Sequence, residues 1–475
     1  MFLRNKIFHR KERKKERLLK ITLIEPQPPG LHVFSEIKLP RLGLTLLGAV
    51  LARLGHDVRI FVEDLAPVNM TRVLESDLVG FSTTTSTVPA AYEMADQVRR
   101  QRKDIPIVFG GSHVTFLAEE ALEHSDYCVR GEGEHTIAEL VASLESGSSP
   151  EGILGLSYKK DGMVFHTPDR PLEKDLDSLP FPDFNLVEGS KKMRITPIAT
   201  SRGCPYNCRF CSVIQMFGRK YRVRDIDNVI EEINEKKPRK VFFYDDNFTA
   251  DRHRTIKMLQ GFIDKCPKFL WSAQVRAEVA RDEEVLKLMY ESGCRIVYIG
   301  FESINQETLT AYNKKLDVSE IVSSIKTIHK HGIRIHGMFV IGADEDTEKT
   351  AKSTVDFALK NKIDTLQLMI LTPLPGTPYF DDLVRDERII SNNWSHYDAH
   401  HVVYQPKQMS PYWLQKETLK QMRRFYSLKN CIRQACRFDI PNLYFRFMGY
   451  KILFNWYRNP FNKNFMKKLR KEVVY

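Results

Sequence analysis

The chain has 475 residues, enough for two or three domains that each bury a core of their own. Its eight cysteines are too few and too scattered for a disulfide framework, so we expect a protein of the reducing cytoplasm. The sequence offers no run of about 18 apolar residues to span a bilayer, and no signal peptide is recognised.

The net charge of +12 is concentrated at the two ends of the chain. Residues 1–20 carry nine Lys and Arg against two Glu, and residues 401–475 carry sixteen against three acids. The segment between them holds more acids than bases, which argues against a nucleic-acid groove through the centre. The basic ends permit peripheral contact with an anionic membrane surface, most of all through the C-terminal tail.

After a basic arm over residues 1–19, residues 20–150 alternate short apolar runs with amphipathic segments, as a parallel sheet covered by helices requires. The pattern predicts strands at Ile21–Glu25, Asp57–Val62, Leu78–Ser82, Ile107–Gly110 and Tyr127–Arg130. Helices are expected at Gly43–Leu54, Pro89–Arg100, Phe116–His124 and Thr136–Leu144. This order predicts a doubly wound, flavodoxin-like layer whose ligands lie at the carboxyl ends of its strands.

The last three of these strand ends are rich in small and flexible residues. Glycine lets backbone approach a ligand closely, and hydroxyls and free amides can hold a phosphate or an amide-rich tail. A plain turn explains each segment about as well, but their recurrence favours a ligand site. The candidate residues are Gly80, Ser82, Thr83, Gly110, Gly111, Gly131 and Glu132.

Residues 151–193 are interpreted as a linker, because the prolines of Leu179–Asp183 favour an extended path. Alternation then resumes over residues 194–400, with strands expected at Arg194–Ala199, Lys240–Tyr244, Leu270–Val275, Ile296–Phe301, Ile333–Ile341 and Thr365–Leu371. Helices are expected at Asp225–Lys236, Thr255–Lys265, Asp282–Ser292, Ser319–His331 and Thr347–Lys360. Catalytic groups of such repeated units gather at the carboxyl ends of the strands.

Three cysteines, Cys204, Cys208 and Cys211, follow the first of these strands. Three thiolates can hold a four-iron cluster and leave one iron open to a small molecule, because a closed cluster takes four. A zinc site would need a further Cys or His close by, and the next His is His253. Unrelated core thiols are the other alternative.

The Cys-x3-Cys-x2-Cys run, with Phe210 before its last cysteine, resembles the signature of radical S-adenosylmethionine enzymes. The resemblance implies a partial (β/α)6 barrel and a [4Fe-4S] cluster held by the three cysteines. In that family the open iron binds S-adenosyl-L-methionine, and an electron from a donor such as flavodoxin or ferredoxin yields a 5′-deoxyadenosyl radical. The protein then supplies position and shielding.

The resemblance also implies contacts with S-adenosylmethionine along the barrel strands. Phe210 would shelter the adenine or the cluster, although packing under a loop explains it too. Asp245 and Asp246 would meet the methionine amino group, unless they cap the next helix. Ser272, Gln274 and Arg276 share one strand face, and if that face points inward Arg276 can pair with the cofactor carboxylate.

Two further contacts come from later strand ends. Glu302, in Gly300–Ser303, resembles the acid that touches the ribose or the methionine amine, and Gly342 ends a strand that resembles the one beside adenine.

The loops within residues 20–150 resemble the cobalamin-binding domain of B12-dependent radical S-adenosylmethionine enzymes, where such loops surround the nucleotide tail. The segment after the first strand, Glu25–Gly30, lacks the Asp-x-His-x-x-Gly motif that supplies an axial histidine to other cobalamin domains. We therefore expect base-off cobalamin without an evident protein axial histidine. His32 lies nearby at a different spacing.

Residues 401–475 predict a helical extension in which aromatic residues interleave with Lys and Arg. An interfacial helix has this composition, and a helix that packs on its own barrel or on a partner looks much the same. Just before it, His400 and His401 are interpreted as satisfied histidines or as an acid–base pair. This region loosely resembles the extension of B12-dependent radical enzymes that act on lipids such as hopanoids.

The resemblance implies an enzyme that C-methylates an unactivated carbon of a small-molecule or lipid-like substrate, or cyclises or rearranges it. One alternative is a methylthiotransferase-like enzyme that acts on tRNA or protein. That family has a second cysteine trio, and residues 1–150 offer only Cys128. Another is a non-catalytic protein that binds cobalamin or responds to redox state. We expect no nucleic-acid partner.

Overall fold

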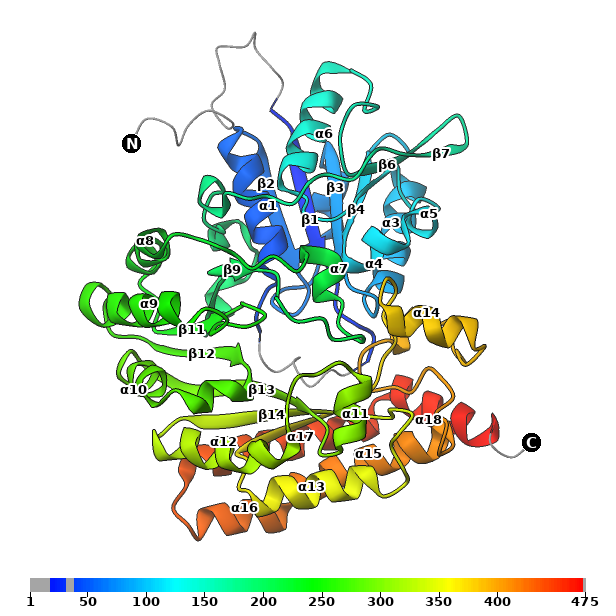
Figure 1. Cartoon of the computed structure of the whole chain (residues 1–475). Coiled ribbons are helices and arrows are strands. Elements are labelled where there is room, and N and C mark those ends of the chain that lie inside the picture. The colour runs from blue at the N-terminus through cyan, green and yellow to red at the C-terminus, as the bar shows by residue number, and fades with distance from the viewer. Residues whose placement is uncertain (1–17, 31–37, 473–475) are drawn as a thin grey trace. The chain divides into compact units, whose positions relative to one another are not determined.

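The computed structural model describes residues 18–30 and 38–472, which divide into two units. The N-terminal unit contains the residues up to Pro28, Lys38–Pro197 and Ser212–Asp225, and the barrel unit contains Ile198–Cys211 and the chain from Ile226 on. Figure 1 labels their helices and strands. Because the units interleave along the chain, the domain borders at residues 20, 151, 194 and 401 stay predictions.

The N-terminal unit is built on a seven-stranded sheet with the order β2-β1-β3-β4-β5-β6-β7. Its first five strands are parallel and confirm the flavodoxin-like order. They are β1 (Lys20–Glu25), β2 (Asp57–Val62), β3 (Leu78–Thr83), β4 (Ile107–Gly111) and β5 (Tyr127–Val129). The helices are α1 (Leu42–Arg53), α2 (Met70–Leu74), α3 (Val88–Gln101), α4 (Ser112–Phe116), α5 (Ala118–Ala121) and α6 (Glu134–Ser146).

One prediction in this unit is wrong, and one segment contains strands that the sequence pattern did not predict. The single helix expected at Phe116–His124 is instead α4 and α5, separated at Leu117, whose φ of −129° and ψ of 52° are not helical. The expected linker contains a hairpin of β6 (Leu156–Lys160) and β7 (Met163–His166), which adds to β5 in antiparallel orientation. Asp161 and Gly162 form its two-residue turn, both with positive φ, a turn chemistry typical of hairpins.

The barrel unit carries a six-stranded sheet with the order β15-β14-β13-β12-β11-β8, and neighbours from β11 to β15 are parallel. The partial barrel of six βα units is therefore confirmed. Its strands are β8 (Thr196–Ile198), β11 (Lys240–Phe243), β12 (Leu270–Val275), β13 (Cys294–Glu302), β14 (Arg334–Ile341) and β15 (Thr365–Ile370). The short segments β9 (Ser201–Arg202), α7 (Val213–Phe217) and β10 (Arg222–Val223) lie between β8 and β11 in sequence.

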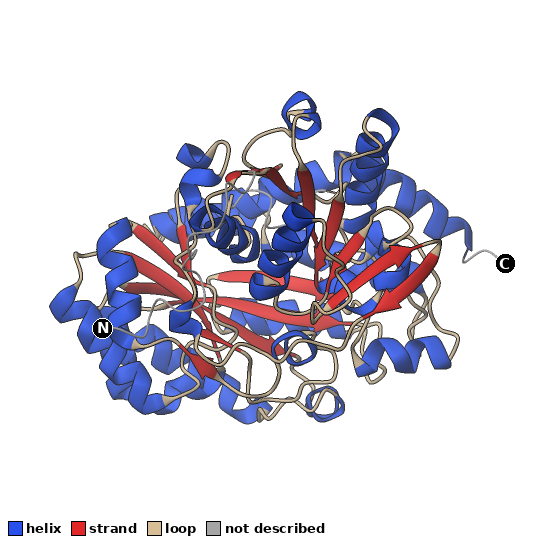
Figure 2. Ribbon diagram, turned by 90° about the horizontal axis from the view of Figure 1, so that it is seen from above, coloured by secondary structure: helices blue, strands red, loops and turns tan. Residues whose placement is uncertain are grey.

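Helices cover the outer face of this sheet, and Figure 2 shows the strands in red and the helices around them in blue. They are α8 (Ile226–Lys236), α9 (Arg252–Lys265), α10 (Glu283–Glu291), α11 (Gln306–Ala311), α12 (Val318–Lys330) and α13 (Thr350–Lys360). The core between the layers is aromatic: the Trp271 ring lies 5.4 Å from that of Phe243 and 5.0 Å from that of Phe248.

The mainly helical C-terminal extension is also confirmed. It contains α15 (Pro411–Phe425), α16 (Leu428–Ala435), α17 (Ile440–Arg458) and α18 (Pro460–Glu472), and α14 (Pro378–Arg385) precedes it. The Tyr426 hydroxyl accepts from the backbone N–H of Leu366 at 2.8 Å and donates to its carbonyl at 2.6 Å, so the extension satisfies the outer edge of β15. Within the described residues, no helix combines the length and apolar character needed to cross a bilayer.

Candidate functional site

Cys204, Cys208 and Cys211 lie on the loop that follows β8 and β9, at the carboxyl end of the barrel strands. None of the three is in a disulfide, all three are partly buried, and burial raises the pKa of the Cys204 and Cys208 thiols. The described residues hold no group of three or more His, Cys, Asp or Glu arranged around a single ion. A four-iron cluster does not require such a single-ion group, because each thiolate binds a different iron. The donor set of three thiols outside any disulfide fits such a cluster.

Asp245 and Asp246 hold the start of this cysteine loop. Asp245 is fully buried and accepts from the Thr200 N–H at 2.6 Å, the Thr200 hydroxyl at 2.5 Å and the Ser201 N–H at 3.3 Å. Asp246 accepts from the Gly203 N–H, and burial with the neighbouring Asp245 charge raises its pKa to about 7. Neither acid caps α9, whose N-cap is Asp251. The cap alternative is therefore wrong, and contact with the methionine amine stays a prediction.

The rest of the loop is held by segments that the sequence did not single out. Asn313 donates its side-chain amide to the Asn207 carbonyl at 2.8 Å, and the Arg209 N–H donates to the Tyr312 carbonyl at 3.1 Å. The Phe210 ring lies 4.9 Å from the Tyr312 ring. The Arg209 guanidinium pairs with Asp382 of α14.

These partners come from the turn after α11 and from α14, where no periodic pattern marks a site. Phe210 thus has the packing role that was its alternative, and a role beside the adenine stays a prediction.

Arg276 lies next to the cysteine loop at the end of β12. Its guanidinium stacks 3.7 Å from the Tyr206 ring centre, pairs with Glu278 at 2.6 Å and donates to the Lys315 carbonyl at 2.7 Å. On the same strand, Trp271 packs toward the helices through its indole N–H, 3.1 Å from the Ser292 carbonyl.

The alternating residues Ser272 and Gln274 are partly exposed on the other face of β12. That face is the inner one, as the predicted contact between Arg276 and the cofactor carboxylate requires, and the contact itself stays a prediction.

Glu302 ends β13 and forms an ion pair with Lys314, 3.0 Å between Oε1 and Nζ. Lys314 is a site residue that sequence reasoning missed. Burial raises the pKa of the Cys208 thiol, and the Lys314 and Glu302 charges act on that pKa in opposite directions, so the pair lies within electrostatic reach of the cysteine loop.

Gly342 lies in a tightly packed turn directly after β14. Its φ is +113°, its N–H donates to Asp346 at 2.8 Å, and a β-carbon there would lie 2.3 Å from the Tyr404 hydroxyl and 2.8 Å from Leu414. Tyr404 donates to the Gly342 carbonyl. Packing therefore explains this glycine, and contact with adenine stays a prediction.

In the N-terminal unit, the predicted residues of β3 and β4 meet at the carboxyl ends of their strands. The Thr83 hydroxyl donates to the Gly110 carbonyl at 3.2 Å, and a β-carbon on Gly111 would lie 2.2 Å from the Thr83 carbonyl oxygen. Gly80 makes room for Leu23 of β1, 2.8 Å from the position of its missing β-carbon. Ser82 is partly exposed beside them. Two of the glycines therefore serve close approach between strands, and cobalamin contact stays a prediction.

Gly131 and Glu132 follow β5. Gly131 has a φ of +69° and donates its N–H to the Thr115 hydroxyl at 3.0 Å. Glu132 is bound at both oxygens by Arg222, at 2.7 and 2.9 Å, and accepts from the Glu173 N–H at 2.8 Å. Glu132 and Arg222 are both buried in this pair, so the carboxylate has a structural role within the unit. Sequence reasoning missed Arg222.

The histidine candidates have different outcomes. His401 is fully buried, with Nδ1 2.9 Å from Asp398 and Nε2 3.1 Å from the Asn462 side chain, which supports the interpretation as a satisfied histidine. His32 lies outside the described residues.

Family models match both parts of the chain: the B12 binding domain at residues 35–141 and the Radical SAM superfamily at residues 198–358. An uncharacterized methyltransferase of Pyrococcus horikoshii is 34% identical over 404 residues, 82% of this chain and 88% of the relative. The bacteriochlorophyllide d C-12(1)-methyltransferase of Chlorobaculum tepidum is 29% identical, with 84% of this chain and 82% of the relative covered.

A solved structure of the cobalamin-dependent S-adenosylmethionine radical enzyme OxsB, with aqua-cobalamin and S-adenosylmethionine bound, shares the fold. Its TM-score is 0.70 at 16% identity, with 96% of this chain and 80% of that chain covered. With both domains matched and a relative similar along most of its length, the chain belongs to the cobalamin-dependent radical S-adenosylmethionine enzymes.

Proposed function

We propose that this enzyme methylates an unactivated carbon of a small-molecule or lipid-like substrate. The observation that carries the proposal is the set of three cysteines outside any disulfide, Cys204, Cys208 and Cys211, at the carboxyl end of the barrel strands of a chain that also contains a B12-binding domain. The two curated relatives named above are methyltransferases, which favours methylation over cyclisation or rearrangement as the outcome.

When bound, the [4Fe-4S] cluster supplies the electron that cleaves S-adenosylmethionine, and cobalamin supplies the methyl carrier. The chain's own residues position these groups. Asp245 fixes the entry of the cysteine loop, and Asn313 and Tyr312 fix its middle. Arg276 and Glu302 offer opposite charges at neighbouring strand ends, suited to the carboxylate and the amine of a methionine group.

We also propose that cobalamin binds base-off, without a protein axial histidine. The described part of the segment after β1 contains no histidine. At the end of β1, the Glu25 carboxylate forms an ion pair with Arg41 at 3.1 Å. A reduced flavodoxin or ferredoxin is the proposed electron donor. The protein is proposed to work in the cytoplasm, with peripheral contact between its C-terminal helices and the inner face of the membrane.

The methylthiotransferase-like alternative is disfavoured by Cys128. It is the only cysteine before Cys204 in the sequence, it is fully buried, and burial raises the pKa of its thiol to about 12. A second cluster has no ligand set in the N-terminal unit.

The proposal is tested by reconstituting the full chain with iron, sulfide and hydroxocobalamin under anaerobic conditions, reducing it with a strong chemical reductant that brings the corrinoid to cob(I)alamin, and then adding S-adenosylmethionine with a deuterated methyl group. We expect about four irons per chain, a corrinoid spectrum, and deuterated methylcobalamin that is later consumed when a substrate is methylated. About eight irons per chain, or the absence of bound corrinoid at saturating cobalamin, would contradict the proposal.

A further inference from the structure

A pocket of about 520 Å³ lies at the amino-terminal ends of β14 and β15 in the barrel unit. It is bounded by the segments around Arg334 and Lys362, which lead into these two strands, and by α16 and α17. The cysteine loop lies at the carboxyl ends of the barrel strands, so the pocket belongs to the opposite end of the unit and is not part of the candidate active site.

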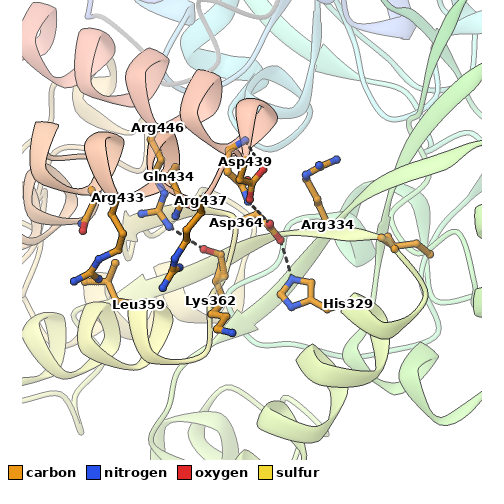
Figure 3. A pocket seen from close by; sticks show the side chains of 15 residues that line it. His329, Arg334, Leu359, Lys362, Asp364, Arg433, Gln434, Arg437, Asp439 and Arg446 are labelled. Carbon is orange, nitrogen blue, oxygen red and sulfur yellow. Dashed lines mark hydrogen bonds and ion pairs between the residues drawn. The ribbon is translucent and has the colours of Figure 1, made fainter.

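The pocket is strongly basic at its rim. Arg334, Lys362, Arg433 and Arg437 line it, and the side chain of each makes no hydrogen bond or ion pair with another described residue. Figure 3 shows Arg433, Arg437 and Lys362 on one side of the paired Asp364 and His329, and Arg334 on the other. Four unpaired cations around one cavity attract an anion with several oxygen acceptors.

Hydrogen bonds hold the side chains at the floor of the pocket, and one buried N–H donor there has no partner among the described residues. Asp364 accepts from His329 at 2.8 Å and from Asn442 at 2.7 Å. Arg446 is 3% exposed and donates to the Phe425 and Ile363 carbonyls at 2.8 and 3.0 Å, while its Nε–H has no partner among the described residues. A buried donor without a partner is costly, which favours a site completed by a ligand.

The helix that builds this floor, α17, also exposes apolar side chains. Its buried side contains Asn442 and Arg446 at the pocket and Leu453 and Trp456 farther along, whereas its exposed side carries an apolar stripe at helical spacing. The stripe continues onto the end of α16, and its large apolar members are between 47% and 87% exposed: Ile432, Phe438, Ile440, Tyr444, Phe447 and Phe454. We call these six residues, with Arg433 and Arg437, the basic–aromatic face.

The surroundings of this face favour an anionic bilayer as its occupant. Between Glu417 and Glu472 the only acid is Asp439, which is engaged by Asn442 at 2.7 Å. A helix with exposed aromatic and aliphatic residues flanked by Lys and Arg has the composition that inserts at the headgroup boundary of anionic membranes. A protein partner would need acids of its own to match this charge, whereas anionic lipid supplies phosphate and apolar tails together.

We propose that the basic–aromatic face docks on an anionic lipid bilayer and that the pocket beside it receives a lipid phosphate. Ile432, Phe438 and Ile440 enter the headgroup region, and Arg433, Arg437 and Lys362 bind phosphate oxygens at the mouth of the pocket. The pocket and the start of α17 lie at the end of the barrel away from the cysteine loop. The inference deepens the proposed peripheral membrane contact of the C-terminal helices and does not rest on the proposed methylation or on a lipid substrate.

The test is co-sedimentation of the full-length protein with vesicles of phosphatidylcholine alone or with phosphatidylglycerol added. We expect binding to the anionic vesicles only, weakened by salt. Arg433→Gln/Arg437→Gln is expected to weaken binding by more than about tenfold, and Phe438→Ser/Ile440→Ser to reduce it similarly. Matched controls at exposed positions on and after α9, Lys257→Gln/Lys268→Gln and Ile263→Ser, should bind like the unchanged protein.

Two further measurements separate the other occupants. Equilibrium dialysis with inorganic phosphate reports a soluble ligand, and sedimentation velocity reports a second copy of the chain. Absence of anionic-vesicle binding, equal loss in the control variants, phosphate binding without vesicle binding, or self-association through the same face would each overturn the proposal. Reductive cleavage of S-adenosylmethionine by the face variants should stay unchanged, so failure of this inference is distinguishable from failure of the proposed function.

Discussion

Glu302 and Lys314 form an ion pair with 3.0 Å between Oε1 and Nζ, and each side chain is only 9% exposed. Glu302 has a φ of 64°, a conformation that residues with a β-carbon rarely adopt, and Gly300 leaves the space that its carboxylate occupies. The surrounding structure therefore holds a carboxylate at the mouth of the barrel, where a contact with S-adenosylmethionine is predicted.

Replacing Lys314 is expected to leave this carboxylate buried without its partner. Lys314→Met should lower the free energy of unfolding by about 3–5 kcal/mol, the usual effect of breaking a buried pair. The double variant Lys314→Met/Glu302→Gln should recover much of that loss, because the unpaired charge is gone. Chemical denaturation measures both, and a double variant no more stable than Lys314→Met would contradict the role given to the pair.

The anchoring role of Asp245 predicts a coupled loss of stability and iron. Asp245→Ala removes the acceptor of two backbone N–H groups and the Thr200 hydroxyl, each worth about 1–3 kcal/mol when left unsatisfied. We expect lower iron content after reconstitution as the cysteine loop loosens. Asp227→Ala, which removes a surface ion pair with Lys265, is the control. Equal iron content in the two variants would show that Asp245 does not hold the loop.

Gly342 and Tyr404 are expected to be energetically coupled. Gly342→Ala forces a β-carbon onto the Tyr404 hydroxyl at a φ of +113°, and overpacking of this kind costs about 1–3 kcal/mol. Tyr404→Phe leaves the Gly342 carbonyl without its donor and costs a similar amount. Because the phenylalanine also removes the clashing oxygen, the double variant should lose less than the two single losses combined. Simple additivity in thermal denaturation would argue against this contact.

His336 gives the fold a pH dependence. Burial lowers the pKa of His336 to about 4, so the ring stays neutral in the folded protein while the unfolded chain binds a proton below about pH 6.5. The unfolded state then binds more protons between these values, and stability rises with pH by at most about 1.4 kcal/mol for each pH unit in this window. We expect His336→Gln to reduce the rise of the free energy of unfolding with pH between pH 4 and 6.5, measured by denaturation of the cofactor-free chain. An unchanged slope would show that His336 does not cause it.

Much of the fold was predictable because buried parallel strands appear in the sequence as short apolar runs with clear ends. Asp57–Val62 and Leu270–Val275 are observed with their predicted bounds. The differences arose where local chemistry outweighed periodicity. Leu117 interrupts an amphipathic pattern, and Asp161-Gly162 forms a hairpin turn in a segment that was interpreted as extended because of the prolines in Leu179–Asp183.

The candidate site was predictable only in part. The cysteine loop was recognisable from the spacing of its cysteines. The ends of the predicted strands indicated the positions of Arg276 and Glu302, because parallel strands end at the same edge of a sheet. Lys314, Asn313 and Asp382 carry no such signal, since tertiary packing alone brings them to the loop. Likewise, nothing in the sequence shows that Arg222 occupies the Glu132 carboxylate.

Radical chemistry at the cysteine loop is tested most directly by measuring 5′-deoxyadenosine formed by the reconstituted, cobalamin-loaded protein after reduction in the presence of S-adenosylmethionine. We expect 5′-deoxyadenosine from the unchanged chain and none above background from Cys204→Ala, Cys208→Ala or Cys211→Ala, while Cys436→Ala, at an exposed position in the C-terminal extension, should cleave normally. No 5′-deoxyadenosine from the unchanged chain, or equal amounts from the Cys208→Ala variant, would contradict it.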